Sequence, residues 1–201
     1  MQLLGLPTLQ ALFSMDGGLE PGQTVLLAGE PGIGKSTALT QLLNGQGVYC
    51  SAEEAYEQYM TRCRRLYLPP STWFDGNEDF GALQWQGADI VVIDSIQTMH
   101  FNNIRGFPGD PLQMRSIGRA CVENARFYRV PVILISQLQK DGDFAGRMEL
   151  AHLVDTTLYL ERDENRNIRA RLGKNRYGPI DKTAIFSMGP TGLLPLEGKS
   201  M

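Results

Sequence analysis

The chain has 201 residues, 42% of them hydrophobic, and no serine-rich or charged linker divides it. We therefore expect one domain over residues 1–201, with an N-terminal segment at 1–14 and a C-terminal tail at 195–201. The formal net charge of −3 excludes a uniformly basic surface that coats nucleic acid, so any contact with nucleic acid has to be local.

Cysteine content and the lack of long apolar runs indicate the compartment. Cys50, Cys63 and Cys121 are scattered and form no CxxC pair, which excludes a disulfide framework and a zinc finger. The N-terminus carries no basic export region, and no run approaches the roughly 18 apolar residues of a membrane span. We expect a cytoplasmic protein without a membrane partner. Because His100 and His152 lie far apart in the sequence, we expect no metal site at them.

Apolar runs alternate with helical spacing through the first two thirds of the chain. The runs are rich in Val, Ile and Leu without polar alternation, as in strands buried on both faces, and lie at residues 24–28, 48–50, 89–93 and 130–135. Helical spacing is found at residues 36–44, 54–65 and 111–129. This alternation predicts an α/β fold with βαβ units and a largely parallel sheet. After residue 150, period-2 runs separated by DENRN and GPID predict antiparallel strands.

The sequence GEPGIGKST follows the first apolar run, opens the first helical segment and has the Walker A spacing. Its glycines let backbone N–H groups converge on phosphate oxygens, and the N-terminus of the following helix adds its positive dipole end. Lys35 would reach the β- and γ-phosphates of ATP, and the Ser36 hydroxyl would ligate Mg²⁺. The alternative is a chance glycine-rich turn, which the strand before it and the helix after it disfavour. The expected nucleotide-binding residues are Gly29, Glu30, Pro31, Gly32, Ile33, Gly34, Lys35, Ser36 and Thr37.

Carboxylates follow two of the predicted buried strands. Asp94 ends the run ADIVVID and is expected to hold the water shell of Mg²⁺, although an aspartate there is by itself more often a helix cap. Glu53 and Glu54 follow the run VYC, at the sheet edge where ligands of open α/β sheets gather. Either glutamate could act on the attacking water. The alternative for both is an acidic first helical turn, favourable to the helix dipole.

Longer motifs give the chain a family resemblance. The sequences GEPGIGKST, YCSAEEA, VVIDSIQTM, KDGDFAGRMELAHLVDTTLYLERD and GKNRYG resemble the RecA-type ATPase core of the bacterial RadA/Sms DNA repair proteins over roughly residues 15–194. The resemblance implies a RecA-like P-loop NTPase fold and an ATP-driven motor of the DnaB helicase type. Such a motor forms a homo-oligomeric, hexameric ring, binds single-stranded or branched DNA and drives branch migration in recombination and repair.

The same resemblance implies roles for individual residues. Lys35, Ser36 or Thr37, and Asp94 match ligands of ATP and Mg²⁺, and Glu53 matches the catalytic glutamate, with Glu54 as its neighbour.

Three further residues match functional positions of the family. Gln137 falls where RecA-like proteins place a γ-phosphate sensor, a position at which RadA usually has histidine. Lys174 and Arg176 match a cationic pair that reaches the nucleotide of an adjacent subunit. Two residues that are two apart on a strand point to the same face, so these cations can approach one anion together. Without the resemblance, they would be two solvated cations at the end of a hairpin.

The chain also departs from the family pattern. It carries neither the four-cysteine zinc motif that precedes the core in RadA/Sms proteins nor the Lon-protease-like domain that follows it. The segment between Lys35 and Glu53 is several residues shorter than the family suggests. We therefore expect a minimal form of the family, such as a phage-encoded one.

Two polar segments are candidates for DNA contact. Residues 100–110 and 138–150 are expected to be loops at the same sheet edge as the ATP site. Their cations could contact phosphates and their aromatic rings could stack on bases, as in a single-strand groove of low sequence preference. The alternative is solvated loops whose aromatic rings pack on the core. The cations are Arg105, Lys140 and Arg147, and the rings are those of Phe101, Phe107 and Phe144.

The residues and the resemblance together favour an ATPase motor that moves single-stranded DNA. The alternative is an ATP-switched, DNA-binding scaffold that loads or stabilises a recombinase filament and hydrolyses ATP only for release. An autokinase of the KaiC type is less favoured, because no phosphoacceptor pair is evident near the C-terminus.

Overall fold

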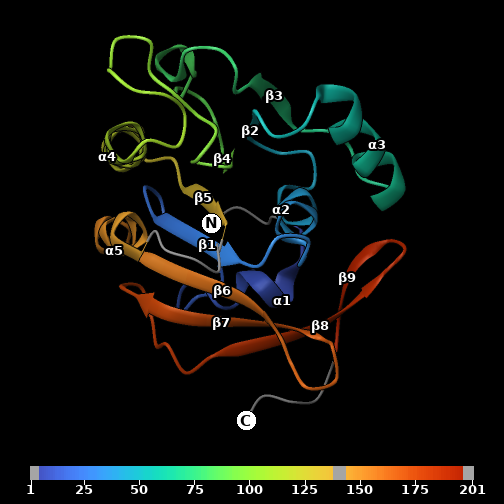
Figure 1. The fold of residues 1–201 in the computed structure, drawn as a ribbon. Helices are drawn as coiled ribbons and strands as arrows, with labels where there is room; N and C mark the ends of the chain where they lie inside the picture. The colour runs from blue at the N-terminus through green and yellow to red at the C-terminus, as the bar shows by residue number, and fades with distance from the viewer. Residues whose placement is uncertain (1–4, 138–143, 197–201) are drawn as a thin grey trace.

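The computed structural model describes residues 5–137 and 144–196, and within them the strands form one sheet in the order β3-β2-β4-β5-β1-β6-β7-β8-β9 (Figure 1). The strands are β1 (Thr24–Gly29), β2 (Val48–Ser51), β3 (Thr72–Asp75), β4 (Val91–Asp94), β5 (Val132–Gln137), β6 (Thr156–Arg162), β7 (Ile168–Asn175), β8 (Thr183–Gly189) and β9 (Gly192–Pro195). The helices are α1 (Pro7–Gln10), α2 (Lys35–Leu43), α3 (Tyr56–Leu66), the short 3₁₀ helix η1 (Phe80–Ala82), α4 (Pro111–Tyr128) and α5 (Phe144–Leu153).

The first six strands of this order are parallel, and they include β1, β2, β4 and β5, which the apolar runs predicted. β1 lies between β5 and β6, and β4 and β2 continue the parallel sheet beyond β5. All six residues of β1 are buried, because helices cover both faces of the sheet there. The predicted α/β fold, with a largely parallel sheet and antiparallel strands at its C-terminal end, is confirmed.

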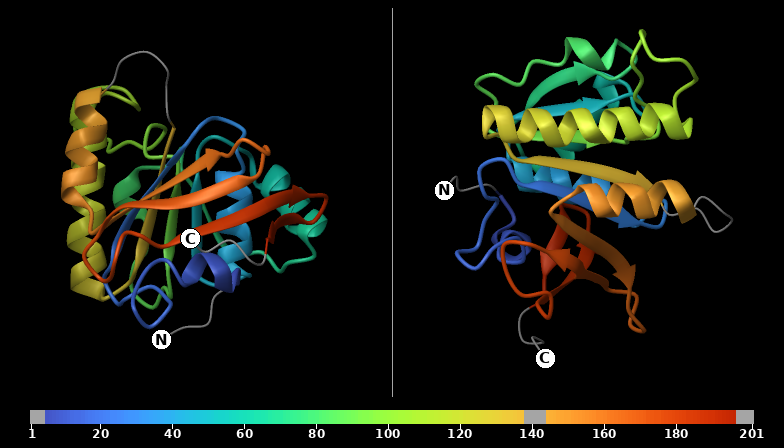
Figure 2. Two further views of the ribbon diagram at one scale, coloured as in Figure 1. Left: turned by 90° about the horizontal axis from the view of Figure 1, so that it is seen from below. Right: turned by 90° about the vertical axis from the view of Figure 1, so that its left-hand side faces the viewer.

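Helices pack on both faces of the sheet and enclose two hydrophobic cores (Figure 2). α2 and α3 contribute to the first core, in which Leu39, Tyr59 and the buried N-terminal Phe13 pack against the strands. α4 contributes Ile117 and Cys121 to the second core, on the opposite face. α5 runs beside α4 and packs against it. Within the described residues, no helix is both long and apolar enough to pass through a membrane.

The C-terminal strands form the predicted antiparallel part of the sheet, and the first of them, β6, also pairs with β1. β6 pairs antiparallel with β7, and β7–β8 and β8–β9 continue in the same manner. β6 also pairs in parallel with β1, which the period-2 pattern of its sequence did not indicate. β6 therefore joins the antiparallel strands to the strand that carries the Walker A sequence.

Two elements differ from the sequence prediction. The segment 138–150 was expected to be a loop, whereas residues 144–153 form α5. Packing on α4 accounts for this helix: Glu149 forms an ion pair with Arg115, and Leu150 lies against Gly118. The edge strand β3 was not predicted, because its four residues are only partly buried or exposed and show no apolar run.

The C-terminal end of α5 is held by Lys174 of β7. The ammonium of Lys174 donates to the carbonyl oxygens of Ala151 and His152, at 3.0 and 3.1 Å, and to that of Val154. These carbonyls have no helical partner, because they lie at the end of a helix. A cation in this position also complements the helix dipole. Lys174 therefore contributes to the fold through α5.

We predict that Lys174→Met lowers the free energy of unfolding by about 1–3 kcal/mol, because it leaves the helix-end carbonyls without their donor. Chemical denaturation monitored by circular dichroism measures the change. Lys182→Met is the matched control, since Lys182 makes two 3.3 Å hydrogen bonds to carbonyls of Ala11 and Ser14 at the surface. The control should change stability by less than about 0.5 kcal/mol. Equal stability of Lys174→Met and the wild-type chain would contradict this role.

Candidate nucleotide-binding site

The Walker A sequence forms a tight turn between β1 and α2 that requires glycine at two positions. Gly32 and Gly34 have φ angles of +74° and +107°, in the region that side chains rarely adopt. A Cβ on Gly34 would also lie 2.5 Å from the terminal methyl of Met188 on β8. The turn directs the free N–H groups at the start of α2 toward the carboxyl edge of the sheet, as an anion site requires.

Lys35, the first residue of α2, is folded back over this turn. Its ammonium is buried and donates to the carbonyl oxygens of Gly29 at 2.8 Å and Glu30 at 3.0 Å. Burial lowers the pKa of Lys35, and the nearby carboxylates of Asp94 and Glu53 oppose that shift. The result is a cation held in place beside two anions, ready to bind an anionic group at the mouth of the turn.

A cavity of about 290 Å³ opens over the turn and brings together residues that are far apart in the sequence. The ammonium of Lys35 and the hydroxyls of Ser36 and Thr37 in its lining are groups that can bind a phosphate chain. The lining residues are Pro31, Gly32, Gly34, Lys35, Ser36, Thr37, Glu53, Asp94 and Ile135. Most of the predicted nucleotide and metal ligands thus face one cavity, together with one of the two candidate glutamates.

Asp94 ends β4 beneath this cavity and is buried, with 4% of its surface exposed. The hydroxyl of Tyr49 on β2 donates to Asp94 Oδ2. Burial is the main cause that raises the pKa of Tyr49, so this hydroxyl keeps its proton and remains a donor. Asp94 and Ser36 line the same cavity, and their hard oxygen atoms suit Mg²⁺, which keeps several waters when it binds proteins.

The structure separates the two glutamates that follow β2. Glu53 lines the cavity, and the hydroxyl of Ser95 donates to its Oε1. Glu54 instead forms an ion pair with Arg62 of α3, which also donates from Nη1 to Glu54 Oε2 at 2.7 Å. Glu53 is therefore placed to act on a ligand in the cavity, whereas Glu54 is occupied by Arg62.

Sequence reasoning did not single out Tyr49, Arg62 or Ser95. Strand parity could have indicated Tyr49: it pairs with Val92 and therefore shares a face with Asp94, two residues further along β4. Ser95 directly follows Asp94, but its bond to Glu53 depends on how the chain turns after β4. Nothing in the local sequence indicated that Arg62 reaches Tyr49.

Lys174 and Arg176 lie at the other end of the sheet from the cavity. Lys174 is opposite Thr157 on β6, near the start of that strand, whereas Gly29 pairs with Leu160 further along it. Arg176 Nη1 donates to Asp155 Oδ1 at 3.1 Å, and Asp155 is buried. Burial lowers the pKa of Lys174, and the charge of Arg176 adds to that shift. Neither cation lines this cavity.

The loop after β4 emerges at the same sheet edge as the cavity and is held by the buried Gln113. The amide of Gln113 accepts from Phe101 N at 2.9 Å and donates to the carbonyls of Phe101 and Ile104. Arg105 is exposed, and Phe107 has 81% of its surface exposed. The loop therefore presents one cation and one aromatic ring to solvent.

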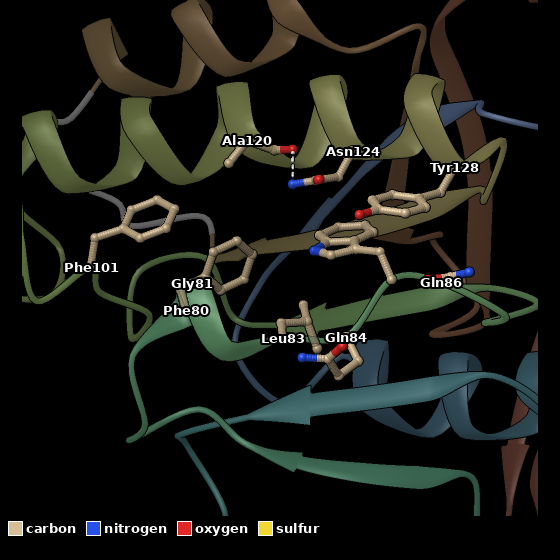
Figure 3. A pocket seen from close by; sticks show the side chains of 10 residues that line it. Phe80, Gly81, Leu83, Gln84, Gln86, Phe101, Ala120, Asn124 and Tyr128 are labelled. Atoms are coloured by element: carbon tan, nitrogen blue, oxygen red, sulfur yellow. Dashed lines mark hydrogen bonds between the residues drawn. The ribbon is translucent and has the colours of Figure 1, made fainter.

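Phe101, by contrast, is directed into the protein (Figure 3). Its ring packs edge-to-face on Phe80 at 5.3 Å and lines a second cavity of about 250 Å³ beside α4, which Tyr128 and Asn124 also line. Phe101 thus packs on the core, unlike Phe107, and is not available for base stacking.

Gln137 ends β5 and pairs in register with Gly29, at the edge where the cavity lies. Its side chain and those of Phe144 and Arg147 lie outside the described part of the structure, as does Lys140. Arg147 belongs to α5 and not to a loop.

The chain is similar to curated DNA repair proteins. The DNA repair protein RadA of Rickettsia bellii is 36% identical over 200 residues, which cover 92% of this chain and 45% of that protein. RadA of Bacillus subtilis is 35% identical over 191 residues, covering 89% of this chain and 42% of that protein. The chain thus spans less than half the length of these relatives. No protein-family model matches it.

Solved structures share the fold at low sequence identity. The flagellar accessory protein FlaH of Methanocaldococcus jannaschii has a TM-score of 0.71 at 12% identity and covers 92% of this chain and 93% of that one. A KaiC-like protein of Pyrococcus horikoshii has a TM-score of 0.66 at 17% identity, with 97% and 100% covered. The RadB recombinase has a TM-score of 0.66 at 22% identity, with 94% and 97% covered. The chain is therefore a homologue of DNA repair proteins named RadA over most of its own length, and it has a RecA-like fold, as its motifs predicted.

Proposed function

We propose that the chain is a Mg²⁺-dependent ATPase of DNA recombination and repair. The observation that carries the proposal is the convergence of Lys35, Ser36, Glu53 and Asp94 on one cavity above the Walker A turn. Homology to DNA repair proteins named RadA supports the biological setting.

Each residue of the cavity has a distinct task in this proposal. The ammonium of Lys35 leaves the carbonyls of the turn and binds the β- and γ-phosphates, with the N–H groups of the turn around them. Ser36 and Asp94 would hold Mg²⁺, which would supply positive charge to offset the charge of the phosphates. Glu53 orients the attacking water and accepts its proton, while Ser95 fixes the carboxylate.

We predict that Glu53→Gln lowers the turnover number by about 100-fold or more and leaves ATP binding intact, because the amide keeps its size but is no longer a base. The matched change Glu54→Gln should retain most of the turnover, because Glu54 faces Arg62 and not the cavity. Phosphate release and binding of a labelled nucleotide measure the two effects. If only Glu54→Gln loses turnover, the assignment of the catalytic glutamate is wrong.

DNA contact is proposed for the loop after β4. Arg105 and Phe107 offer a cation and an exposed ring at the edge of the sheet that also holds the cavity. A cation for phosphate and a ring for bases suit single-stranded DNA without sequence preference. A loop at this edge is also well placed to respond to nucleotide, because Ser95 precedes it and contacts Glu53.

We predict that Arg105→Ala weakens binding of single-stranded DNA and lowers the slope of log affinity against log salt by about one, because one phosphate contact is lost. Fluorescence anisotropy across a salt series measures both. Arg119→Ala, on the exposed surface of α4, is the control and should leave the slope unchanged. Absence of DNA binding at low salt with ATP present would contradict the proposal that the chain acts on DNA.

The position of Lys174 and Arg176 supports assembly into a homo-oligomeric ring, for which we propose six subunits. Because the pair lies at the end of the sheet opposite the cavity of its own subunit, it can serve a nucleotide only in a neighbouring subunit. Arg176 is 53% exposed at its side chain and can leave Asp155, with which it forms an ion pair. An arginine supplied by a neighbour can raise the rate of phosphoryl transfer about 1000-fold or more.

We predict that Arg176→Ala and Lys35→Ala are each nearly inactive and that mixing the two restores part of the activity. At mixed interfaces, an intact Lys35 faces an intact Arg176, so hydrolysis can occur there. The measurement is ATP hydrolysis by mixtures at varied ratios, with subunit exchange verified by labelled chains. Exchange without recovery would show that Arg176 does not act between subunits.

A scaffold that loads or stabilises a recombinase filament is the second candidate. The contacts of Lys174 with α5 and of Arg176 with Asp155 favour it, because they give both cations a partner within one subunit. A motor separates or moves DNA strands with each round of hydrolysis, whereas a scaffold only binds and releases.

A further inference from the structure

Arg62 of α3 lies between the Walker A helix, β2 and the segment that carries the two glutamates. Its side chain is 12% exposed and stacks over the rings of Tyr49 and Tyr59, at 5.3 and 5.5 Å. Its donors bind three different partners. Nε donates to Thr40 Oγ1 at 2.8 Å and Nη2 to Tyr49 at 3.0 Å, while the guanidinium holds Glu54 from two nitrogens.

Two of these partners are hydrogen-bonded to residues that line the cavity. Thr40 on α2 donates its hydroxyl to the carbonyl oxygen of Ser36, at 2.8 Å. Tyr49 on β2 donates to the carboxylate of Asp94. The two proposed Mg²⁺ ligands, on α2 and β4, are thus connected through one guanidinium.

The third partner, Glu54, is adjacent in the sequence to Glu53, the proposed catalytic base. Glu54 is the immediate neighbour of Glu53, so the ion pair with Arg62 fixes the backbone from which Glu53 reaches the cavity. Arg62 itself does not line the cavity.

We propose that Arg62 is a positioning residue that sets Ser36, Asp94 and Glu53 relative to one another through Thr40, Tyr49 and Glu54. This inference rests on the proposed function, because it assigns a task toward the MgATP of that function. Residues that hold a metal ion depend on such outer partners, and loss of a partner commonly weakens metal affinity by about 10- to 100-fold.

The chemistry of the side chain supports this role over simple filling of space. An apolar residue could stack on Tyr49 and Tyr59 and would need no partners. The planar guanidinium instead supplies several donors in a rigid fork, and its hydrogen-bond partners belong to three separate segments. A lysine has a single point of charge and cannot bind all three in the same geometry.

The test compares Tyr49→Phe and Arg62→Lys with the wild-type chain. Tyr49→Phe keeps the ring and the ion pair between Arg62 and Glu54 but removes the bond to Asp94. Arg62→Lys keeps the charge but loses the fork. Arg64→Gln is the control on the same helix, because Arg64 is exposed and its guanidinium donates to the nearby Thr61 hydroxyl, at 3.3 Å, rather than to a residue that supports the cavity.

Two quantities are measured: affinity for a fluorescent ADP in EDTA, and affinity of the ADP-loaded protein for Mn²⁺ by electron paramagnetic resonance of the free ion. We expect both variants to weaken Mn²⁺ binding about tenfold or more. ADP affinity in EDTA should stay at the wild-type value, as should both quantities in Arg64→Gln.

The outcomes separate this inference from the proposed function. A wild-type chain that binds no ADP would overturn the proposed function and this inference with it. A wild-type chain that binds ADP and Mn²⁺, with Tyr49→Phe unchanged in both, would overturn the positioning role alone. Circular dichroism checks folding, and if Arg62→Lys does not fold, Tyr49→Phe decides the question because it retains the partly buried ion pair between Arg62 and Glu54.

Discussion

Parallel pairing of β1 with β5 and β6 is the constraint on which the site depends. Parallel strands end at the same edge, so the residues that follow them meet there whatever their distance in the sequence. β1 brings the Walker A turn to this edge, β4 brings Asp94, and β2 brings Glu53. Because β6 continues the parallel part and then pairs with β7, the cations at the end of β7 are carried to the opposite edge. The same sheet thus places the proposed nucleotide site and the proposed interface cations on different surfaces.

The charged side chains beneath the cavity are buried, and their hydrogen-bond partners fix their positions before any ligand binds. Lys35 and Asp94 are both removed from water, which is unfavourable unless each charge has partners. The turn carbonyls serve Lys35, and the Tyr49 hydroxyl serves Asp94. Tyr49 thus holds Asp94 where a metal ion would need it, whereas Lys35 has to exchange the turn carbonyls for the phosphates on binding. Arg62 lies one contact further out, because it binds Tyr49 and Thr40, which bond to Asp94 and Ser36, and does not line the cavity itself.

Much of this organisation could be predicted from the sequence, since the Walker A spacing and the apolar runs are local signals. The residues alone left the choice between Glu53 and Glu54 open, because adjacent residues in a segment leaving a strand can point either way until packing fixes them. Only the family resemblance favoured Glu53. α5 was missed because the segment was interpreted by its polar residues, whereas its contact with α4 comes from residues distant in the sequence. The task of Arg62 depends on three segments meeting at one side chain, which no single motif encodes.

The proposed nucleotide site is tested most directly by an experimental structure of the chain with Mg²⁺ and a non-hydrolysable ATP analogue. The β- and γ-phosphates should lie over the Walker A turn and be bound by Lys35. Asp94 should face the ion through water, and Glu53 should lie beside the γ-phosphate. The contacts of Arg62 with Tyr49 and Glu54 should be retained. A nucleotide bound elsewhere would contradict the proposed site. So would a nucleotide whose γ-phosphate lies beside Glu54 with Arg62 released.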